Sequence, residues 1–172
     1  MSEQLWAPWR LKYIESGIKP DGCIFCMFPA SPVEEDSGNL ILHRGELAFI
    51  LLNAYPYSNG HLMVVPYRHT STLDSLTAAE LTETSRLVRV AVNVLASAFH
   101  PDGFNLGVNM GHVAGAGIAD HLHWHVVPRW SGDTNFMPVL AGVKVIPESL
   151  EVVRMRLATA LPQVLDRESR FV

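Results

Sequence analysis

Three histidines alternate with apolar residues in one short stretch of the chain, and this alternation constrains the fold more than any other feature. The stretch covers residues 121–127 and reads HLHWHVV. A period of two is that of a β-strand, so we expect a strand over 121–127 with its three imidazoles on one face. Leu122, Trp124 and Val126 then point toward a core from the other face. The residues alone leave both metal binding and nucleophilic catalysis open for the histidine face.

The composition favours one compact domain that does not bind long nucleic acids. The chain has 172 residues, is 48% hydrophobic and carries a formal net charge of -4. This length supports a single hydrophobic core, whereas binding to long nucleic acids usually needs a basic face. We expect one domain over 1–172, with an N-terminal arm over 1–22, a core over 23–135 that holds the histidines, and a C-terminal helix region over 147–161.

Neither a signal peptide nor a membrane span is expected. Residues 5–10 (LWAPWR) interrupt any apolar run near the N-terminus, and no apolar stretch is long enough to cross a bilayer. We therefore expect a cytoplasmic protein whose partner is neither a membrane nor a nucleic acid.

The order of predicted elements indicates an α+β fold with an antiparallel sheet. Thr77 and Glu80 form a capping box at the start of one long helix, whose apolar residues recur at helical spacing until about residue 100. A second helix is predicted over 147–161, with Pro147 in its first turn. Short apolar runs bounded by turn residues predict strands over 40–43, 47–52, 61–65, 104–109 and 121–127. Strands, a helix and then further strands are typical of an antiparallel layer fold.

A glycine-rich segment precedes the three histidines and is typical of a phosphate-binding loop. Gly115, Ala116 and Gly117 are our candidates, because glycines let backbone N–H groups approach a phosphate that side chains would crowd. Asn109 lies just before this loop, a place at which an ordinary loop cap is common.

The spacing of the histidines resembles the His-φ-His-φ-His-φ-φ signature of the histidine triad superfamily of nucleotide hydrolases and transferases. Asn53 and His61 also lie eight residues apart, as do two site residues of that family. The resemblance implies that His123 attacks the α-phosphorus of a nucleotide and forms a nucleotidyl-imidazole intermediate. His125 and His61 would hydrogen-bond phosphate oxygens or orient the ring, and Asn53 would bind the ribose hydroxyls; an Asn that merely starts a turn is the alternative.

The same resemblance implies an architecture. Histidine triad proteins have a sheet of about five antiparallel strands, one long helix and a C-terminal helix, and they usually pair into homodimers. Many members carry Gly-Gln-Ser or Gly-Gln-Thr in the glycine loop, whereas this chain has Gly115-Ala116-Gly117-Ile118. Backbone donors are therefore expected to carry more of the phosphate binding here. Relatives also place an Asn or Gln that contacts phosphate where Asn109 lies, so the resemblance implies this role for Asn109, with an ordinary loop cap as the alternative.

The cysteines Cys23 and Cys26 form a C-x-x-C pair, which in a reducing compartment indicates metal or redox chemistry more than a disulfide. A tetrahedral zinc site needs two more ligands, for which His69 and His121 are the candidates. Zinc-bearing members of the family have the same spacings. Because four protein ligands leave no open position, such a zinc would stabilise the fold and would not activate water.

Two segments resemble the bacterial diadenosine tetraphosphate (Ap4A) phosphorylases of this superfamily: residues 5–10 and residues 128–136 (PRWSGDTNF). This implies phosphorolysis of Ap4A to ATP and ADP, with inorganic phosphate as co-substrate. Trp130 would lie near the adenine, and Asp133 with Asn135 near the far end of the polyphosphate. The alternatives are a dinucleoside polyphosphate hydrolase, an adenosine phosphoramidase, a zinc hydrolase that uses the three strand histidines, and a non-catalytic nucleotide-binding protein.

Overall fold

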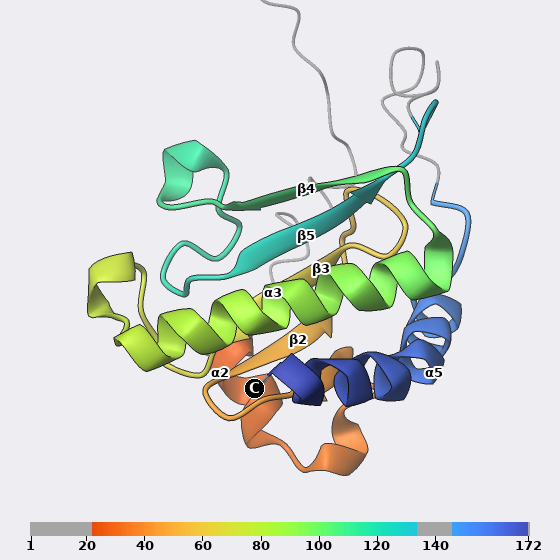
Figure 1. The fold of residues 1–172 in the computed structure, drawn as a ribbon. Coiled ribbons are helices and arrows are strands. Elements are labelled where there is room, and N and C mark those ends of the chain that lie inside the picture. Colours follow the sequence, from red (N-terminus) through yellow and green to blue (C-terminus); the bar gives the residue numbers. More distant parts are fainter. Residues whose placement is uncertain (1–21, 134–145, 172) are drawn as a thin grey trace, which may run out of the picture.

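The computed structural model describes residues 22–133 and 146–171, which form an antiparallel sheet with two long helices on one face and a short helix on the other (Figure 1). Five strands pair in the order β1-β2-β3-β5-β4, which confirms the predicted α+β class and the strand number. The strands are β1 (Ile41–Arg44), β2 (Ala48–Leu52), β3 (Leu62–Pro66), β4 (Gly103–Val108) and β5 (Trp124–Arg129). No helix in these ranges is long and apolar enough to cross a membrane. The predicted arm over 1–22 lies almost entirely outside the described residues, as does Asn135.

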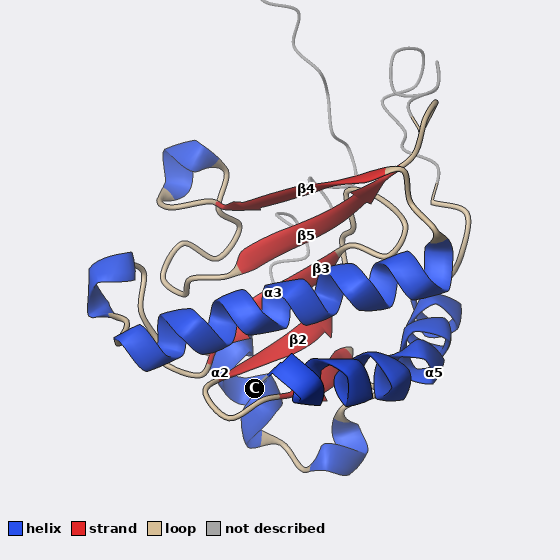
Figure 2. Cartoon of the chain, in the orientation of Figure 1, coloured by secondary structure: helices blue, strands red, loops and turns tan. Residues whose placement is uncertain are grey.

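Each central strand buries both of its faces, because the sheet is covered on both sides. On one face, Ile50 and Val64 join α3 (Ala78–Phe99) and α5 (Leu150–Glu168) in the larger core. On the other face, Phe49 packs in a smaller core with α2 (Ile24–Ala30). Figure 2 shows α3 and α5 lying together on one side of the strands. Alternate residues of one strand therefore serve the two cores.

The long helix α3 begins and ends where its sequence signals place it. The hydroxyl of Thr77 accepts a hydrogen bond from the backbone N–H of Glu80, and the Glu80 side chain bonds back to Thr77, so the predicted capping box is present. The helix ends at His100, which has a left-handed backbone with φ 48°. Its buried residues recur along one face against the sheet and α5.

The C-terminal helix α5 covers 150–168, whereas the sequence predicted 147–161. It starts later because Ser149 is the N-cap and accepts a hydrogen bond from the Val152 N–H. It also continues past the predicted end at Leu161, through Pro162, to Glu168. Tertiary packing offsets the missing hydrogen bond: Val164 is buried in the core, and the carboxylate of Glu168 accepts hydrogen bonds from side chains of α3.

The last strand, β5, starts at Trp124 and ends at Arg129, so the prediction of a strand over 121–127 is wrong in its first half. The pairing of β5 with β3 stops at the residue pair Val64 and Trp124. The next positions of β3 lead to Pro66, which has no N–H to continue the ladder. The other strand limits lie within one residue of those predicted, and Leu40 precedes β1 because its φ of 60° is incompatible with a strand.

The short helix α2 was not predicted. It follows Cys23 directly and packs Phe25 against the sheet. Arg44 of β1 fixes the C-terminal end of α2. Its guanidinium donates hydrogen bonds to the backbone oxygens of Pro29 and Ser31 and to the carboxylate of Asp36. Helix α2 is thereby fixed over the face of the sheet that carries the histidines.

Candidate active site and metal centre

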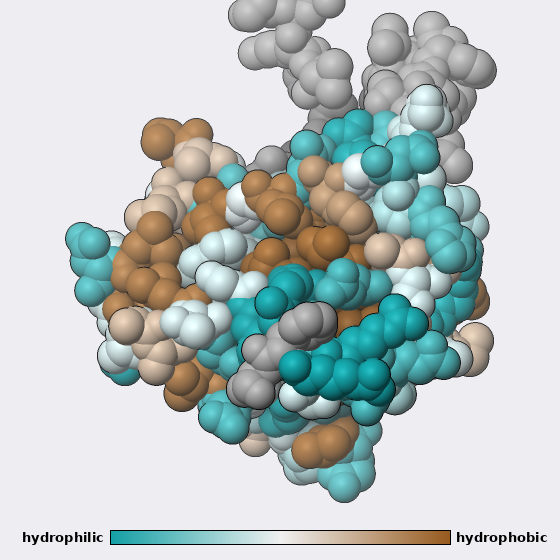
Figure 3. Space-filling model, in the orientation of Figure 1, coloured by the Kyte–Doolittle hydropathy of each residue, from teal (hydrophilic) through white to brown (hydrophobic). Residues whose placement is uncertain are grey.

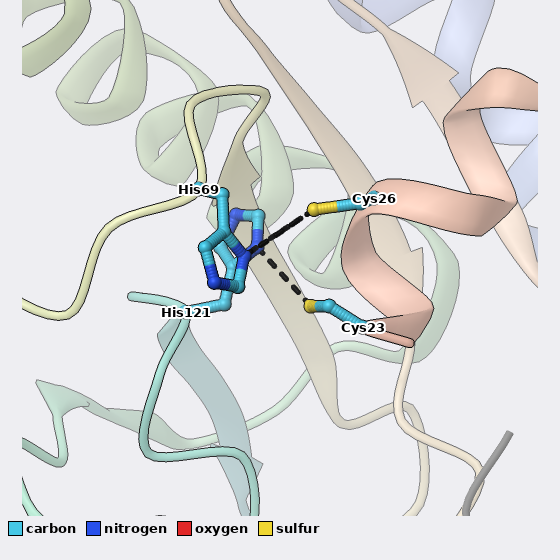
Figure 4. A group of neighbouring side chains, drawn as sticks. All are labelled: Cys23, Cys26, His69 and His121. Carbon is cyan, nitrogen blue, oxygen red and sulfur yellow. Dashed lines mark hydrogen bonds between the residues drawn. The ribbon is translucent and has the colours of Figure 1, made fainter. Parts of the chain in front are cut away.

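Two cysteines and two histidines converge beside α2 (Figure 4). Cys23 caps α2, Cys26 lies in its first turn, His69 follows β3 and His121 precedes β5. The Nδ1 atom of His121 lies 3.3 Å from the Cys23 sulfur, 3.6 Å from the Cys26 sulfur and 3.2 Å from Nδ1 of His69. The structure thus brings together the four residues predicted as zinc ligands.

The donor set fits a tetrahedral cation. With Zn–S near 2.3 Å and Zn–N near 2.0–2.1 Å, the edges of a tetrahedron are roughly 3.3–3.8 Å, and the sulfur of Cys26 lies 3.4 Å from Nδ1 of His69. The Nε2 atom of His121 lies 2.9 Å from the carbonyl oxygen of Pro66. Since a carbonyl only accepts, Nε2 carries the proton and Nδ1 presents a lone pair to the cluster.

Metal binding depends on the protonation states of the histidine and cysteine side chains in this cluster. Burial lowers the pKa of His121, which favours the neutral imidazole that binds metals. Burial, and then the neighbouring Cys23, raise the pKa of the Cys26 thiol. A divalent cation would oppose both effects on Cys26, because it stabilises the thiolate.

His123 is fixed with one nitrogen directed into a pocket. Its side chain is buried, and its Nδ1 lies 2.9 Å from the carbonyl oxygen of His121. The carbonyl must accept, so Nδ1 carries the proton and Nε2 holds a lone pair. Burial lowers the pKa of His123, so the ring is neutral near pH 7. A neutral, oriented imidazole in a pocket is suited to nucleophilic attack.

A series of hydrogen bonds through His61 determines the tautomer of the third histidine, His125. The backbone N–H of Tyr57 donates to Nδ1 of His61 over 3.1 Å, so His61 carries its proton on Nε2. That nitrogen lies 3.0 Å from Nδ1 of His125, which must therefore accept. His125 is left with its proton on Nε2, a buried atom without a hydrogen-bond partner among the described residues.

The pocket beside these histidines encloses about 850 Å³, including its open mouth. The predicted site residues that line it are His123, His125, Asn53, Gly115 and Gly117. Most other lining residues are apolar, and the sequence analysis missed them: Ile24, Phe25, Phe28, Leu40, Leu51 and Met63. Aliphatic and aromatic side chains carry no chemical signal in a sequence, although the position of α2 next to the C-x-x-C pair could have indicated Phe25.

Asn53 lines the pocket but also organises the loop after β2. Its Oδ1 accepts a hydrogen bond from the Tyr55 N–H at 2.9 Å, and its Nδ2 lies 3.3 Å from Nδ1 of His61. An amide offers two donor hydrogens and two acceptor lone pairs. Each polar atom of Asn53 therefore has capacity for one further hydrogen bond to a ligand.

The remaining predicted residues lie around the pocket or away from it. Gly115 has φ 86° and ends the short turn after β4, a conformation that favours glycine. Ala116 is buried beside it and does not line the pocket. Asn109 follows β4 and is also absent from the lining. Trp130 directly follows β5, at the end of the strand opposite to His125, so within this chain it lies away from the pocket.

Comparison with known proteins places this arrangement in a family. Residues 34–132 match the HIT domain. The chain belongs to the histidine triad (HIT) family. A HIT relative from Mycobacterium tuberculosis, named AP-4-A phosphorylase, is 44% identical over 163 residues, which cover 91% of this chain and 83% of that protein.

More distant HIT proteins share less of the chain. An asymmetrical bis(5'-nucleosyl)-tetraphosphatase of Schizosaccharomyces pombe is 31% identical over 114 residues, which cover 66% of this chain and 58% of that enzyme. A crystal structure of a zinc-bound histidine triad family protein from Mycobacterium smegmatis matches with a TM-score of 0.67 at 24% identity, over 85% of this chain and 97% of that one. The structural match supports the HIT fold.

Proposed function

We propose that the protein is a nucleotidyltransferase that cleaves dinucleoside polyphosphates, with inorganic phosphate as acceptor and Ap4A as substrate. One observation carries the proposal: a buried His123, whose Nε2 lone pair is fixed toward the pocket, lies beside His125, whose Nε2–H is free to donate. The ring centroids of the two histidines are 4.9 Å apart. The relative named AP-4-A phosphorylase supports the choice of substrate and acceptor.

The reaction follows from the two tautomers. Nε2 of His123 attacks the α-phosphorus, an N–P bond forms, and the bond from the α-phosphorus to its bridging oxygen breaks, which releases ATP from Ap4A. The proton stays on Nδ1, and the carbonyl oxygen of His121 that accepts its hydrogen bond stabilises the positive charge of the adduct. Nε2–H of His125 donates to a phosphate oxygen whose charge grows in the transition state.

The second step regenerates the enzyme. An oxygen of inorganic phosphate attacks the same phosphorus, the N–P bond breaks, and ADP leaves with His123 again neutral. Attack by water instead would give AMP. The glycine loop at Gly115 and Gly117 is suited to hold the phosphates through backbone N–H groups, since both residues line the pocket.

Product analysis tests this function. Ap4A is incubated with the protein with and without inorganic phosphate, and the nucleotides are separated. ATP plus ADP, formed only with phosphate, is the expected result. ATP plus AMP in both samples would overturn the phosphorylase assignment in favour of a hydrolase. His123→Ala should reduce turnover by at least about 10³-fold. His100→Asn is the control: His100 caps the C-terminal end of α3 and does not line the pocket, so this variant should keep the turnover of the parent protein.

We further propose that Cys23, Cys26, His69 and His121 bind a structural zinc ion. The four donor atoms leave no position for water. The zinc hydrolase alternative would need the three triad histidines to share a metal. His121 instead directs Nδ1 to the cysteines, while Nδ1 of His123 and Nδ1 of His125 are used in hydrogen bonds to other groups.

We also propose that the protein is a homodimer joined through β4. This strand forms one edge of the sheet, and its burial decreases toward the middle, where Leu106 is 55% exposed. Met110 and Val113 extend the apolar surface beyond it. Figure 3 shows apolar surface over β4, β5 and the turn that follows β4. An exposed apolar edge strand is suited to pairing with a second copy.

A further inference from the structure

We propose that Asn39 recognises the nucleotide base: its Oδ1 accepts a hydrogen bond from the 6-amino group of adenine, and its Nδ2–H donates to an adjacent ring nitrogen. The inference rests on the proposed function, since it assumes that the pocket holds a nucleotide. It adds a residue that determines base specificity, at the end of the pocket away from the catalytic histidines.

The first observation is an unpaired polar atom. Nδ2 of Asn39 is buried and has no hydrogen-bond partner in the described part of the chain. A buried donor without a partner destabilises the folded protein, so such an atom calls for an explanation. Asn39 lines the same pocket as His125, whose Nε2 is also buried without a hydrogen-bond partner among the described residues. Both unpaired donors therefore belong to one cavity, and one ligand can satisfy both.

The second observation is the order of residues along the pocket wall. His125 contacts His61, which contacts Asn53. The residue before Asn53, Leu52, donates its N–H to the carbonyl of Leu40 at 2.9 Å, and Asn39 directly precedes Leu40. If His125 binds phosphate and Asn53 binds ribose, the next position along this wall is that of the base, and Asn39 occupies it.

The third observation is that the backbone of Asn39 is held in place. Its N–H donates to the carbonyl of Glu35 at 2.9 Å. Leu40 has a left-handed φ of 60°, a conformation that is costly for a residue with a side chain and that clusters at functional sites. Arg44 fixes the preceding segment through Asp36. A constrained backbone thus fixes the position from which the Asn39 side chain extends at the pocket wall.

The chemistry of the surroundings favours a purine. Ile24, Phe28 and Leu40 line the pocket with Asn39 and offer apolar surfaces to the faces of a flat ring. The amide adds one donor and one acceptor side by side. Adenine presents the complementary pair, an amino group next to an acceptor nitrogen, and asparagine pairs with this edge in other protein complexes.

Binding of two mononucleotides tests the inference by calorimetry. The probes are AMP and purine riboside 5′-monophosphate, which lacks only the 6-amino group. We expect the protein to bind AMP about tenfold more tightly, and Asn39→Leu, of similar volume, to bind both probes equally. Asn59→Leu is the matched control, because Oδ1 of Asn59 is also buried and unpaired but does not line the pocket. It should retain the preference for AMP.

Each outcome has a distinct meaning. The ratio of the two dissociation constants within one variant is independent of how much of that variant is folded, so a destabilised Asn39→Leu remains informative. An unchanged ratio in Asn39→Leu would overturn the role of Asn39. A parent protein that binds neither probe would instead overturn the proposed function itself.

Discussion

Nε2 of His61 lies 3.0 Å from Nδ1 of His125, and this contact sets the proton position of a histidine that faces the pocket. The proton on His61 is directed to Nε2 because the backbone N–H of Tyr57 already donates to the other nitrogen. His125 is consequently a donor toward the pocket. A backbone group in the loop after β2 thus determines the tautomer of a side chain on β5.

Removal of His61 is expected to impair catalysis through His125. Without its partner, His125 can carry its proton on either nitrogen, so His61→Ala should lower kcat by about 10²-fold with a smaller change in KM. Steady-state kinetics on Ap4A measure both. The combined His61→Ala, His125→Ala variant should lose much less than the product of the two single losses. Losses that simply multiply would contradict the coupling between these histidines.

Loss of one cysteine is expected to release the metal and to destabilise the fold. A ligand at 100 times its Kd stabilises the native state by about 2.7 kcal/mol, so Cys23→Ser should lower the free energy of unfolding by at least about that amount while activity per folded molecule changes less. Metal analysis and thermal melting measure the two effects. His112→Ala removes an exposed histidine outside the cluster and should retain zinc. Metal that stays in Cys23→Ser but disappears from His123→Ala would support the zinc hydrolase instead.

Acid is expected to destabilise the protein partly through His125. Burial, and then the neighbouring His123, lower the pKa of His125 from 6.5 to about 4. Between these values the unfolded chain binds a proton that the folded chain does not, so the free energy of unfolding should fall as pH drops from 6.5 to about 4, with no contribution above 6.5. Urea unfolding at several pH values measures the slope. His125→Gln should show a shallower slope over this range, and an equal slope would exclude His125 as its source.

A charge on the edge strand is expected to separate the dimer. Leu106→Glu places a carboxylate where the proposed interface excludes water, so sedimentation should show a monomer at concentrations at which the parent protein is dimeric. Val152→Glu is the control, since Val152 is 41% exposed on α5, away from β4. A parent protein that is monomeric, or a Leu106→Glu variant that remains dimeric, would contradict pairing through β4.

The sequence alone determined those features that depend on local patterns. The apolar periodicity of the strands and the capping box of Thr77 and Glu80 placed most elements within one residue, because neighbouring residues control these conformations. The spacing of Cys23, Cys26 and His69, with His121, identified the cluster that the fold assembles. The alternation around His123 likewise placed this histidine and His125 on the pocket side of the sheet.

Tertiary structure decided everything that depends on a partner distant in the chain. Strand β5 starts at Trp124 because the facing strand ends in Pro66, and α5 continues through Pro162 because the core and Glu168 hold it. The proton positions of His121, His123 and His125 follow from carbonyl and N–H groups of other segments. The unpaired amide of Asn39 is likewise visible only when the pocket is folded. Periodicity fixes which way a side chain points, whereas hydrogen-bond partners are set by contacts that only the packed chain creates.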